Sequence, residues 1–177
     1  MNKQALRRDL RAVRSHFAPE ASIVVGEAFR ARLRPGAIVA SYVPVGGEAH
    51  PLPLEQVATS AGCRLALPHV VDRATPLRFL AWEADGALTT GPFRLRQPAE
   101  TAQAVTPDII LTPLVGFDRS GGRLGQGAGH YDRAFAALPQ AWRVGVAWSI
   151  QELAMLPSDP WDVPLHAIAT EREWITP

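Results

Sequence analysis

The sequence contains few of the residues that form covalent or metal cross-links, and it contains no long apolar run. Cys63 is the single cysteine among the 177 residues, so neither an internal disulfide nor a multi-cysteine zinc site can form. No apolar run approaches the roughly 20 residues that a membrane-spanning helix needs. The basic segment that follows Met1 is not followed by the apolar stretch of a signal peptide. We therefore expect a cytoplasmic protein with no membrane partner.

The sequence also has little excess charge and very little lysine. Eighteen Lys and Arg residues oppose 17 Asp and Glu residues, which leaves a net charge of +1. Binding of duplex nucleic acid is driven by a dense basic surface that releases counterions, so this balance argues against nucleic acid as the partner. Lys3 is the single lysine. Because a compact ammonium binds a phosphate oxygen differently from a planar guanidinium, Lys3 is a candidate binding residue.

The length and the apolar content are typical of one globular domain. With 177 residues, of which 47% are hydrophobic, the chain can bury one sizeable core. No linker, repeat or low-complexity tract divides it, so we expect a single domain over residues 1–177. The expected strands are 37–42, 64–67, 77–82, 108–112, 143–147 and 166–169, and the expected helices are 3–17, 54–61 and 131–138.

The alternation of these strands and helices predicts an α/β fold. The strands are apolar without alternation, which is typical of a mostly parallel sheet that helices cover on both faces. The strand that begins at Arg64 is expected to stop at Pro68. Residues 83–107 are rich in Gly, Pro, Thr and Gln and predict an irregular surface segment.

The expected N-terminal helix carries two parallel rows of side chains. The apolar row comprises Leu6, Leu10, Val13 and Phe17. The basic row comprises Lys3, Arg7, Arg11 and Arg14. At about 100° per residue the basic row lies roughly 90° from the apolar one, along its border. Basic side chains there can lean over a neighbouring cleft, and a solvated flank is the alternative.

A glycine-rich segment lies between the expected strand at 108–112 and the expected helix at 131–138. Gly125, Gly127 and Gly129 alternate there, and Arg123 precedes them. Glycine permits left-handed backbone, so N–H groups can converge on an anion, and the following helix N-terminus adds partial positive charge. Ligands of open α/β sheets bind beyond the carboxyl ends of strands, where this segment begins. We interpret it as a phosphate-binding loop, with a ligand-free glycine turn as the alternative.

The spacing in this loop excludes several other motifs. Gly-x-Gly-x-Gly is not the Gly-x-Gly-x-x-Gly of dinucleotide folds, and a Walker A loop needs a lysine after its last glycine. Neither Gly-x-Ser-x-Gly nor His-Glu-x-x-His occurs.

Two carboxylates are candidate metal ligands. A bound triphosphate is normally accompanied by Mg²⁺, which one or two carboxylates hold. Asp132 directly follows the glycine-rich loop, and Asp162 lies in a proline-rich segment. Compensation of the helix dipole and turn formation are the respective alternatives.

Taken together, these residues resemble the 5-formyltetrahydrofolate cyclo-ligase family, also called the 5,10-methenyltetrahydrofolate synthetases. The strongest match is Gly116-Phe117-Asp118 followed by Gly-Arg-Leu-Gly-x-Gly-x-Gly-x-Tyr-Asp-Arg over residues 122–133. Further matches span nearly the whole chain: Lys3-x-x-Leu6-Arg7, Tyr42-x-Pro44 with Glu48, Leu67-Pro68-x-Val70, Gln151, Leu156-Pro157, Asp162 and Thr170-Glu171.

The resemblance implies a three-layer α/β/α fold and an ATP- and Mg²⁺-dependent ligase. In the implied reaction the formyl oxygen of 5-formyltetrahydrofolate attacks the γ-phosphate of ATP. The N10 nitrogen then closes a five-membered ring and phosphate leaves, which yields 5,10-methenyltetrahydrofolate and ADP. The implied partners are a reduced folate and ATP, and we expect a monomer. The protein's task in such a reaction is positioning and charge neutralisation.

The resemblance also implies a role for each matching residue. Catalytic roles go to Arg123 and Tyr131, and metal binding goes to Asp132 and Asp162. The residues implied to bind ATP are Lys3, Arg7, Arg123, Leu124, Gly125, Gln126, Gly127, Ala128, Gly129, His130 and Tyr131. The residues implied to bind folate are Tyr42, Glu48, Gln126, Gly127, Ala128, Gly129 and His130.

The sequence departs from the family's pattern mainly on the folate side. Gln126 stands where an aromatic residue or Met is usual, and Arg94-Leu95-Arg96-Gln97-Pro98 replaces a Gly-Ile-x-Glu-Pro stretch. The other departures are His50, His130, Trp161 and His166. A non-catalytic or altered-substrate paralogue that binds folate or nucleotide is therefore a second hypothesis. Nucleic-acid binding through the basic helix at 3–14 is a third.

Overall fold

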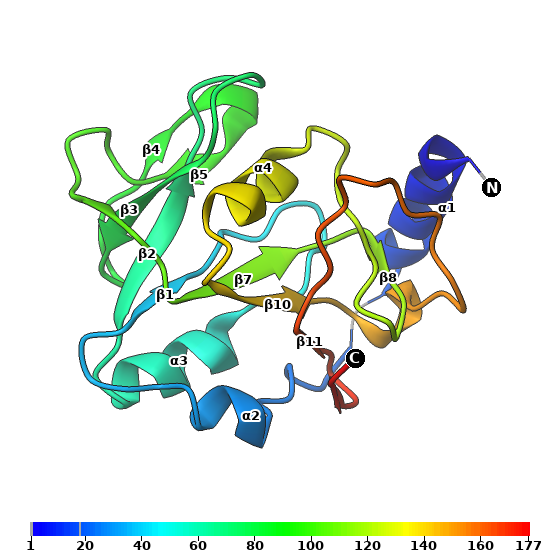
Figure 1. Ribbon diagram of the computed structural model, residues 1–177, viewed down its shortest axis with the longest axis horizontal. Coiled ribbons are helices and arrows are strands. Elements are labelled where there is room, and N and C mark those ends of the chain that lie inside the picture. The colour runs from blue at the N-terminus through cyan, green and yellow to red at the C-terminus, as the bar shows by residue number, and fades with distance from the viewer. Residues whose placement is uncertain (1, 18) are drawn as a thin grey trace.

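Eight strands form one sheet in the computed structural model, which describes residues 2–17 and 19–177. They are β1 (Ile38–Ala40), β2 (Arg64–His69), β3 (Arg78–Trp82), β6 (Ala104–Val105), β7 (Ile109–Pro113), β10 (Trp142–Val146), β11 (Ala167–Ala169) and β12 (Trp174–Ile175). Their order is β12-β11-β10-β7-β1-β2-β3-β6 (Figure 1). The strands from β11 to β2 are parallel, and β12, β3 and β6 add antiparallel edges. The expected mostly parallel sheet is confirmed.

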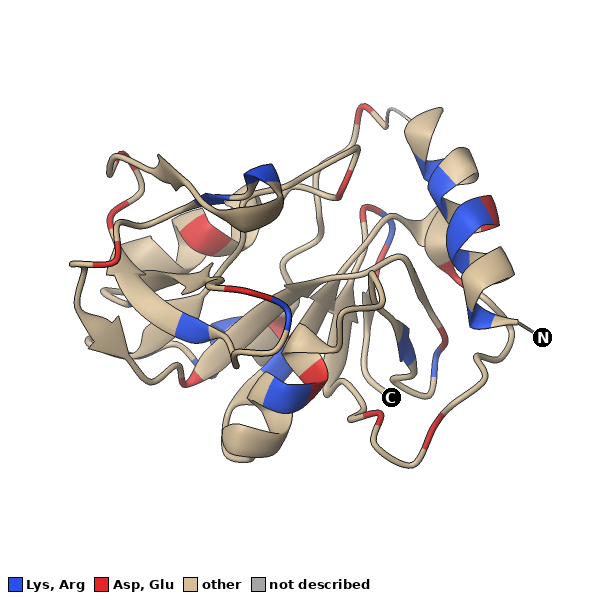
Figure 2. Cartoon of the chain, turned by 90° about the horizontal axis from the view of Figure 1, so that it is seen from above, with Lys and Arg blue, Asp and Glu red and all other residues tan. Residues whose placement is uncertain are grey.

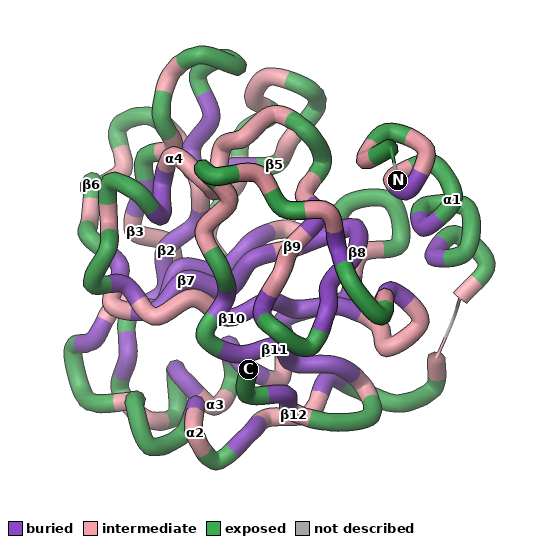
Figure 3. The backbone as a smooth tube through the Cα atoms, turned by 45° about the vertical axis from the view of Figure 1, so that its right-hand side comes forward, coloured by how far each residue is buried: buried purple, intermediate pink, exposed green. Residues whose placement is uncertain are grey.

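Helices cover both faces of this sheet, which confirms the three-layer α/β/α arrangement. The helices and 3₁₀ turns are α1 (Lys3–Ser15), α2 (Glu27–Arg30), α3 (Leu52–Ser60), η1 (Pro92–Arg94), α4 (His130–Ala137) and η2 (Ser149–Gln151). α2 and α3 bury Phe29 and Leu54 against one face, and α4 buries Phe135 against the other. The buried backbone concentrates in the central strands (Figure 3). None of the helices in the described part of the chain is long and apolar enough to cross a membrane.

The N-terminal helix α1 lies beside the sheet, beyond the carboxyl end of β7 (Figure 1). It packs on a hairpin of β8 (Gly116–Phe117) and β9 (Arg123–Leu124), which pair antiparallel. Leu6 and Leu10 of the helix form a small core with residues of the hairpin and of the segment after η2. This packing places the basic row of α1 at the end of the sheet where α/β proteins bind ligands.

The buried face of α1 differs from the apolar row that the sequence predicts. Leu6 and Leu10 are buried as expected, but Val13 is 51% exposed. Phe17 follows the helix and packs on Trp148, with the two ring centroids 5.8 Å apart. Arg14 is buried instead, at 4% exposure. Residues four apart share one face of a helix, so Arg14 lies on the same buried face as Leu6 and Leu10. The groups that Arg14 contacts are backbone carbonyls rather than apolar side chains.

Other departures from the expected elements occur where strands are short or lie at edges. β2 continues through Pro68 to His69, because β1 pairs with it only as far as Ala66 and only β3 runs beside the rest. The segment at 83–107 is less irregular than expected. It contains a ribbon of β4 (Thr89–Thr90) and β5 (Arg96–Gln97), and it also contains the edge strand β6. The sequence did not predict α2, β12 or the β8–β9 pair.

A buried carboxylate shapes the turn between β8 and β9. Asp118 is 5% exposed, and its Oδ1 accepts hydrogen bonds from the Ser120 and Gly122 N–H groups at 3.0 Å each. Its Oδ2 accepts a third from the N–H of Leu156 at 2.8 Å. Burial tends to raise the pKa of Asp118, but these bonds and one from the Ser120 hydroxyl outweigh it and hold the pKa below its ordinary value. The turn that leads into Arg123 therefore depends on one ionised side chain.

Replacement of Asp118 by alanine is expected to lower the free energy of unfolding at pH 7 by about 2–3 kcal/mol, because several buried N–H donors lose their acceptor. The native pKa is depressed, so this stabilisation is present above the unfolded pKa of about 4 and is lost as the pH falls through the native value. Urea unfolding of the wild type and of Asp118→Ala at pH 7 and pH 3 measures this difference in the free energy of unfolding. Asp85→Ala is the control, because Asp85 is exposed. Equal losses in the two variants at pH 7 would contradict this role.

Candidate active site

The basic row of α1 faces the glycine-rich loop and the segment between η2 and β11. Lys3 Nζ lies 2.7 Å from Oδ2 of Asp159 and 2.7 Å from Oδ2 of Asp162. One turn further along, Arg7 Nε donates to the carbonyl of Gly125 at 2.8 Å. Figure 2 shows the basic residues spaced along α1. The row is therefore not a solvated flank, because its members contact loops more than 100 residues away in the sequence.

The glycine-rich loop has the backbone conformation that its glycines were expected to permit. Gly127 has φ +104° and Gly129 has φ +68°, both in the left-handed region where a side chain is strained. Gly129 caps α4, and no side chain bonds its cap position in the described structure. A Cβ on Gly127 would lie 3.5 Å from the Arg7 guanidinium carbon. The loop thus brings the N-terminus of α4 and the Arg7 side chain to one place, which favours an anion there.

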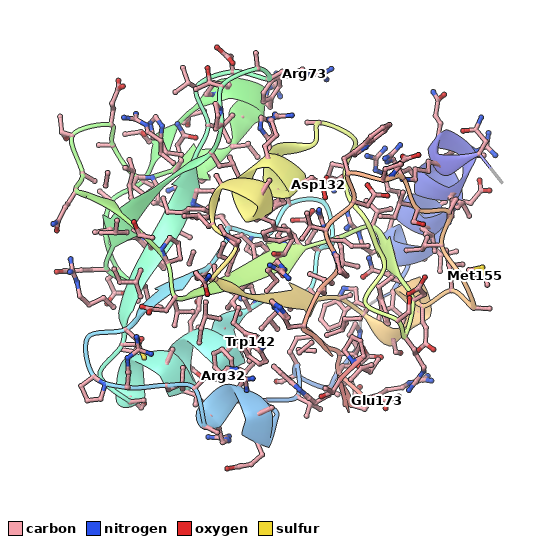
Figure 4. All side chains as sticks on the ribbon, in the orientation of Figure 1. Arg32, Arg73, Asp132, Trp142, Met155 and Glu173 are labelled. Atoms are coloured by element: carbon pink, nitrogen blue, oxygen red, sulfur yellow. The ribbon has the colours of Figure 1, made fainter. Side chains whose placement is uncertain are left out.

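Arg123 is a buried cation beside this loop. Its side chain is 5% exposed and forms an ion pair with Asp132 of α4. The guanidinium carbon lies 5.2 Å from the Phe135 ring centroid and 5.9 Å from that of Tyr131. Its Nε is buried without a partner among the described residues. Figure 4 shows Asp132 at the end of α4 nearer α1, so the pair lies within reach of the glycine-rich loop.

The two carboxylates expected to hold a metal each contact a cation. Asp132 accepts from Arg123, and Asp162 accepts from Lys3. Burial raises the pKa of Asp162, but the hydrogen bonds from Lys3 and from the Asp159 N–H, with the charges of Lys3 and Arg123, outweigh burial and lower it. The Arg123 charge thus acts on both carboxylates. Each carboxylate thus has its own cation, and no cluster of three or more metal-binding side chains occurs in the described ranges.

Glu48 contacts the glycine-rich loop from the segment that follows β1. Its Oε1 accepts from Nε2 of Gln126 at 3.0 Å, and its Oε2 accepts from the Val45 N–H at 3.1 Å. Gln126 also accepts from Arg11 of α1 through its Oε1. Burial raises the pKa of Glu48, and the Val45 N–H, the Arg14 charge and the Gln126 amide only partly offset it.

Two tyrosines flank this carboxylate. Tyr42 is buried and donates its hydroxyl to the carbonyl of Ala49, so it braces the segment that carries Glu48. Burial and the Glu48 charge raise the pKa of Tyr131, and the same two causes raise that of Tyr42. Both phenols are therefore neutral at physiological pH.

The structure brings most of the residues singled out in the sequence to one region. Lys3 contacts Asp162, and Arg123 contacts Asp132. The glycine-rich loop itself contacts Arg7 through Gly125 and Glu48 through Gln126. The His130 side chain is an exception, because it contacts Arg133 instead of these groups: its Nδ1 lies 3.3 Å from Nη2 of Arg133. Burial lowers the pKa of His130 most, and the charges of Arg133 and Arg73 lower it further. Figure 4 shows Arg73 at the top of the view, above α4 and apart from Asp132.

Sequence reasoning missed two of the residues at this site. Asp159 shares Lys3 with Asp162, and Arg14 is buried next to Glu48. Arg14 had a signal, since it continues the basic row of α1. Asp159 had none beyond its position three residues before Asp162.

Comparison with known proteins gives one family. A model of the 5-formyltetrahydrofolate cyclo-ligase family matches residues 1–171. A 5-formyltetrahydrofolate cyclo-ligase of Escherichia coli strain K12 is 34% identical over 150 residues, which cover 77% of this chain and 80% of that protein. One of Mycolicibacterium smegmatis is 35% identical over 150 residues, covering 79% and 76%. The NMR structure of Aquifex aeolicus 5,10-methenyltetrahydrofolate synthetase matches with a TM-score of 0.76 at 29% identity, covering 99% of this chain and 93% of that one.

Proposed function

The chain belongs to the 5-formyltetrahydrofolate cyclo-ligase family, and we propose that it uses ATP to close 5-formyltetrahydrofolate into 5,10-methenyltetrahydrofolate. It is thus an enzyme, a ligase of one-carbon metabolism. The observation that carries the proposal is the convergence of Lys3, Arg7 and Arg123 with the glycine-rich loop at the N-terminus of α4. In this proposal ATP binds at these three cations and folate binds at Glu48.

The triphosphate is held by groups that now contact protein carboxylates or carbonyls. Lys3 exchanges Asp159 and Asp162 for phosphate oxygens, and Arg7 leans over the loop whose amides bind the same anion. Leu124 to Tyr131 supply the backbone of the cradle. Arg123, with its buried and unpartnered Nε, neutralises charge that develops on the transferred phosphoryl group.

The reaction is a phosphoryl transfer followed by ring closure. The formyl oxygen attacks the γ-phosphorus, the bond from that phosphorus to the bridging oxygen breaks, and ADP leaves. The N10 nitrogen then attacks the activated formyl carbon, its proton is lost and phosphate departs with the former formyl oxygen. An amide oxygen is a poor leaving group, so its phosphorylation drives the closure. The protein's contribution is alignment and electrostatics.

Asp132 and Asp162 fit Mg²⁺ by the chemistry of their donors. Hard carboxylate oxygens are its preferred protein ligands, and one or two suffice because the ion keeps waters and phosphate oxygens. Bound with ATP, the ion would supply charge neutralisation at the phosphates. Lys3 and Arg123 balance these carboxylates without it, which keeps the site together before substrate binds.

The folate is proposed to bind through its pterin ring at Glu48. A carboxylate accepts hydrogen bonds from adjacent ring N–H donors. In this structure the amide Nε2 of Gln126 donates to Oε1 of Glu48, which is one of the two oxygens that would accept from the pterin. Tyr42 braces the segment, and the backbone of Gln126 to His130 lies between the two substrate positions.

The test is a direct assay. Purified protein incubated with 5-formyltetrahydrofolate, ATP and Mg²⁺ is expected to form the methenyl product, followed by its absorbance. Loss of product with nucleotide binding intact would replace the proposal by the paralogue hypothesis. Binding to an oligonucleotide that weakens steeply with salt would favour the nucleic-acid hypothesis instead.

Replacement of Lys3 by glutamine is expected to raise the KM for ATP by about 10-fold and to leave the KM for folate unchanged, because one charge-assisted phosphate contact is lost. Arg8→Gln is the matched control on the same helix, since the Arg8 side chain is 77% exposed and pairs only with its neighbour Asp9. Steady-state kinetics with each substrate varied in turn measure both effects. Wild-type ATP kinetics in Lys3→Gln would remove α1 from the nucleotide site.

A further inference from the structure

Arg14 is an arginine buried next to the proposed folate carboxylate. The residue is 4% exposed, and its Nη1 lies 3.8 Å from Oε1 of Glu48. The two side chains are 5% and 7% exposed. A buried cation is costly unless it is paired, and among the described residues Glu48 is the carboxylate in ion-pair contact with it.

The same guanidinium fixes the segment that carries Glu48. Nη2 donates to the carbonyl of Gly46 at 3.1 Å, and Nη1 reaches the carbonyl of Leu114 at 3.4 Å. Gly46 lies two residues before Glu48, and Leu114 directly follows β7. Arg14 therefore ties helix α1, the end of a central strand and the Glu48 segment to one point.

We propose that Arg14 is a positioning residue for the folate, which fixes the Glu48 carboxylate and supplies the positive charge that this buried carboxylate needs to accept the pterin. The inference rests on the proposed function, in which Glu48 binds the pterin. It divides the basic row of α1 by substrate. Lys3 and Arg7 serve the nucleotide, and Arg11 and Arg14 serve the folate, Arg11 through Gln126.

The charged and titratable groups that face Glu48 come from three elements. α1 contributes Arg14 and Arg11, the segment after β1 contributes Tyr42, and α4 contributes Tyr131. Burial and the Glu48 charge raise the pKa of both phenols, which therefore stay neutral where a carboxyl group titrates, so Glu48 is the group of this cluster that changes charge on the acid side. Burial raises its pKa and the Arg14 charge lowers it, so removal of Arg14 raises the pKa further.

The deciding variant is Arg14→Gln, whose amide can still donate to a carbonyl but carries no charge. Because an opposite charge at this distance lowers a carboxyl pKa by about 1–3 units, the acid limb of kcat/KM for folate should move up by about 1 pH unit. The loss should thus be about 10-fold below the acid limb and much smaller on the plateau above it, with the KM for ATP unchanged. Arg14→Lys restores the charge and should recover most of the activity on the acid limb. In a Glu48→Gln background, Arg14→Gln should cause no further shift of the acid limb of kcat/KM for folate.

The controls separate this role from a structural one and from the proposed function. Arg8→Gln should keep the wild-type pH profile, and wild-type turnover establishes the reaction independently. A variant Arg14→Gln with a lower Tm and an unshifted acid limb would overturn the inference while the proposed function stands. If that variant is insoluble, Arg14→Met, which keeps a similar length and carries no charge, replaces it. Its acid limb should move up in the same way, and an unshifted limb would again overturn the inference.

Discussion

Replacement of Arg123 by glutamine is expected to lower kcat/KM by at least about 10³-fold, the largest effect of any single change at this site. The guanidinium is buried and pairs with Asp132, and its charge helps to lower the pKa of Asp162. A water-excluded charge aimed at a transferring phosphoryl group is worth more than an exposed one, because it needs no reorganisation during the reaction. Arg123→Lys should recover little, since an ammonium lacks the planar fork.

The control for this prediction lies on the same hairpin. Arg119 is 54% exposed and pairs with Glu152 and Glu173. Arg119→Gln should keep kcat/KM within about 3-fold of the wild type, because exposed ion pairs contribute little. Turnover with saturating folate and varied ATP measures both variants, and circular dichroism verifies their folding. An Arg123→Gln enzyme as active as Arg119→Gln would exclude Arg123 from the chemistry.

Replacement of Glu48 by glutamine is expected to lower kcat/KM for folate by about 10²-fold, mainly through KM, while the KM for ATP is unchanged. Hydrogen bonds to a charged acceptor contribute about 1.5–3 kcal/mol each, and the amide has one acceptor oxygen instead of two. Gln126 and Arg14 are left facing a neutral group, so the segment after β1 also loses part of its anchorage.

The matched control is an exposed glutamate in another part of the fold. Glu100 has a side chain that is 75% exposed and pairs with Arg78. Glu100→Gln should leave both Michaelis constants unchanged. A folate KM in Glu48→Gln within 2-fold of the wild type would place the pterin elsewhere, whereas a parallel rise in the KM for ATP would indicate that Glu48 supports the whole site.

The elements that the sequence predicted well are those with a local cause. The buried strands follow from short apolar runs, and the left-handed backbone at Gly127 and Gly129 follows from the freedom of glycine itself. α3 begins two residues before its expected start, at Leu52, because proline is tolerated in the first turn of a helix. The two-residue edge strands β6 and β12 were missed, since so short a run has no periodicity to detect.

The partners within the site could not be predicted from the sequence, even where its residues could. Lys3 and Asp162 are 159 positions apart and Arg7 and Gly125 are 118 apart, and nothing local states that they meet. Arg14 is the sharpest case, because its position on the basic border of α1 predicts exposure to a cleft rather than burial. Its burial depends on the carbonyls of Gly46 and Leu114 and on the Glu48 carboxylate, which two segments far apart in the sequence supply.

The amino-acid sequence alone determined the α/β architecture, the left-handed backbone of the glycine-rich loop and the family resemblance, because each is encoded in a short stretch of neighbouring residues. Only the tertiary structure decided that the basic row of α1 contacts Asp162, the glycine-rich loop and Glu48, and that every candidate carboxylate has a cationic or amide partner. The physical reason is that charge pairing and burial depend on distances through space, and these are set by how the sheet, α1 and α4 pack rather than by any one segment.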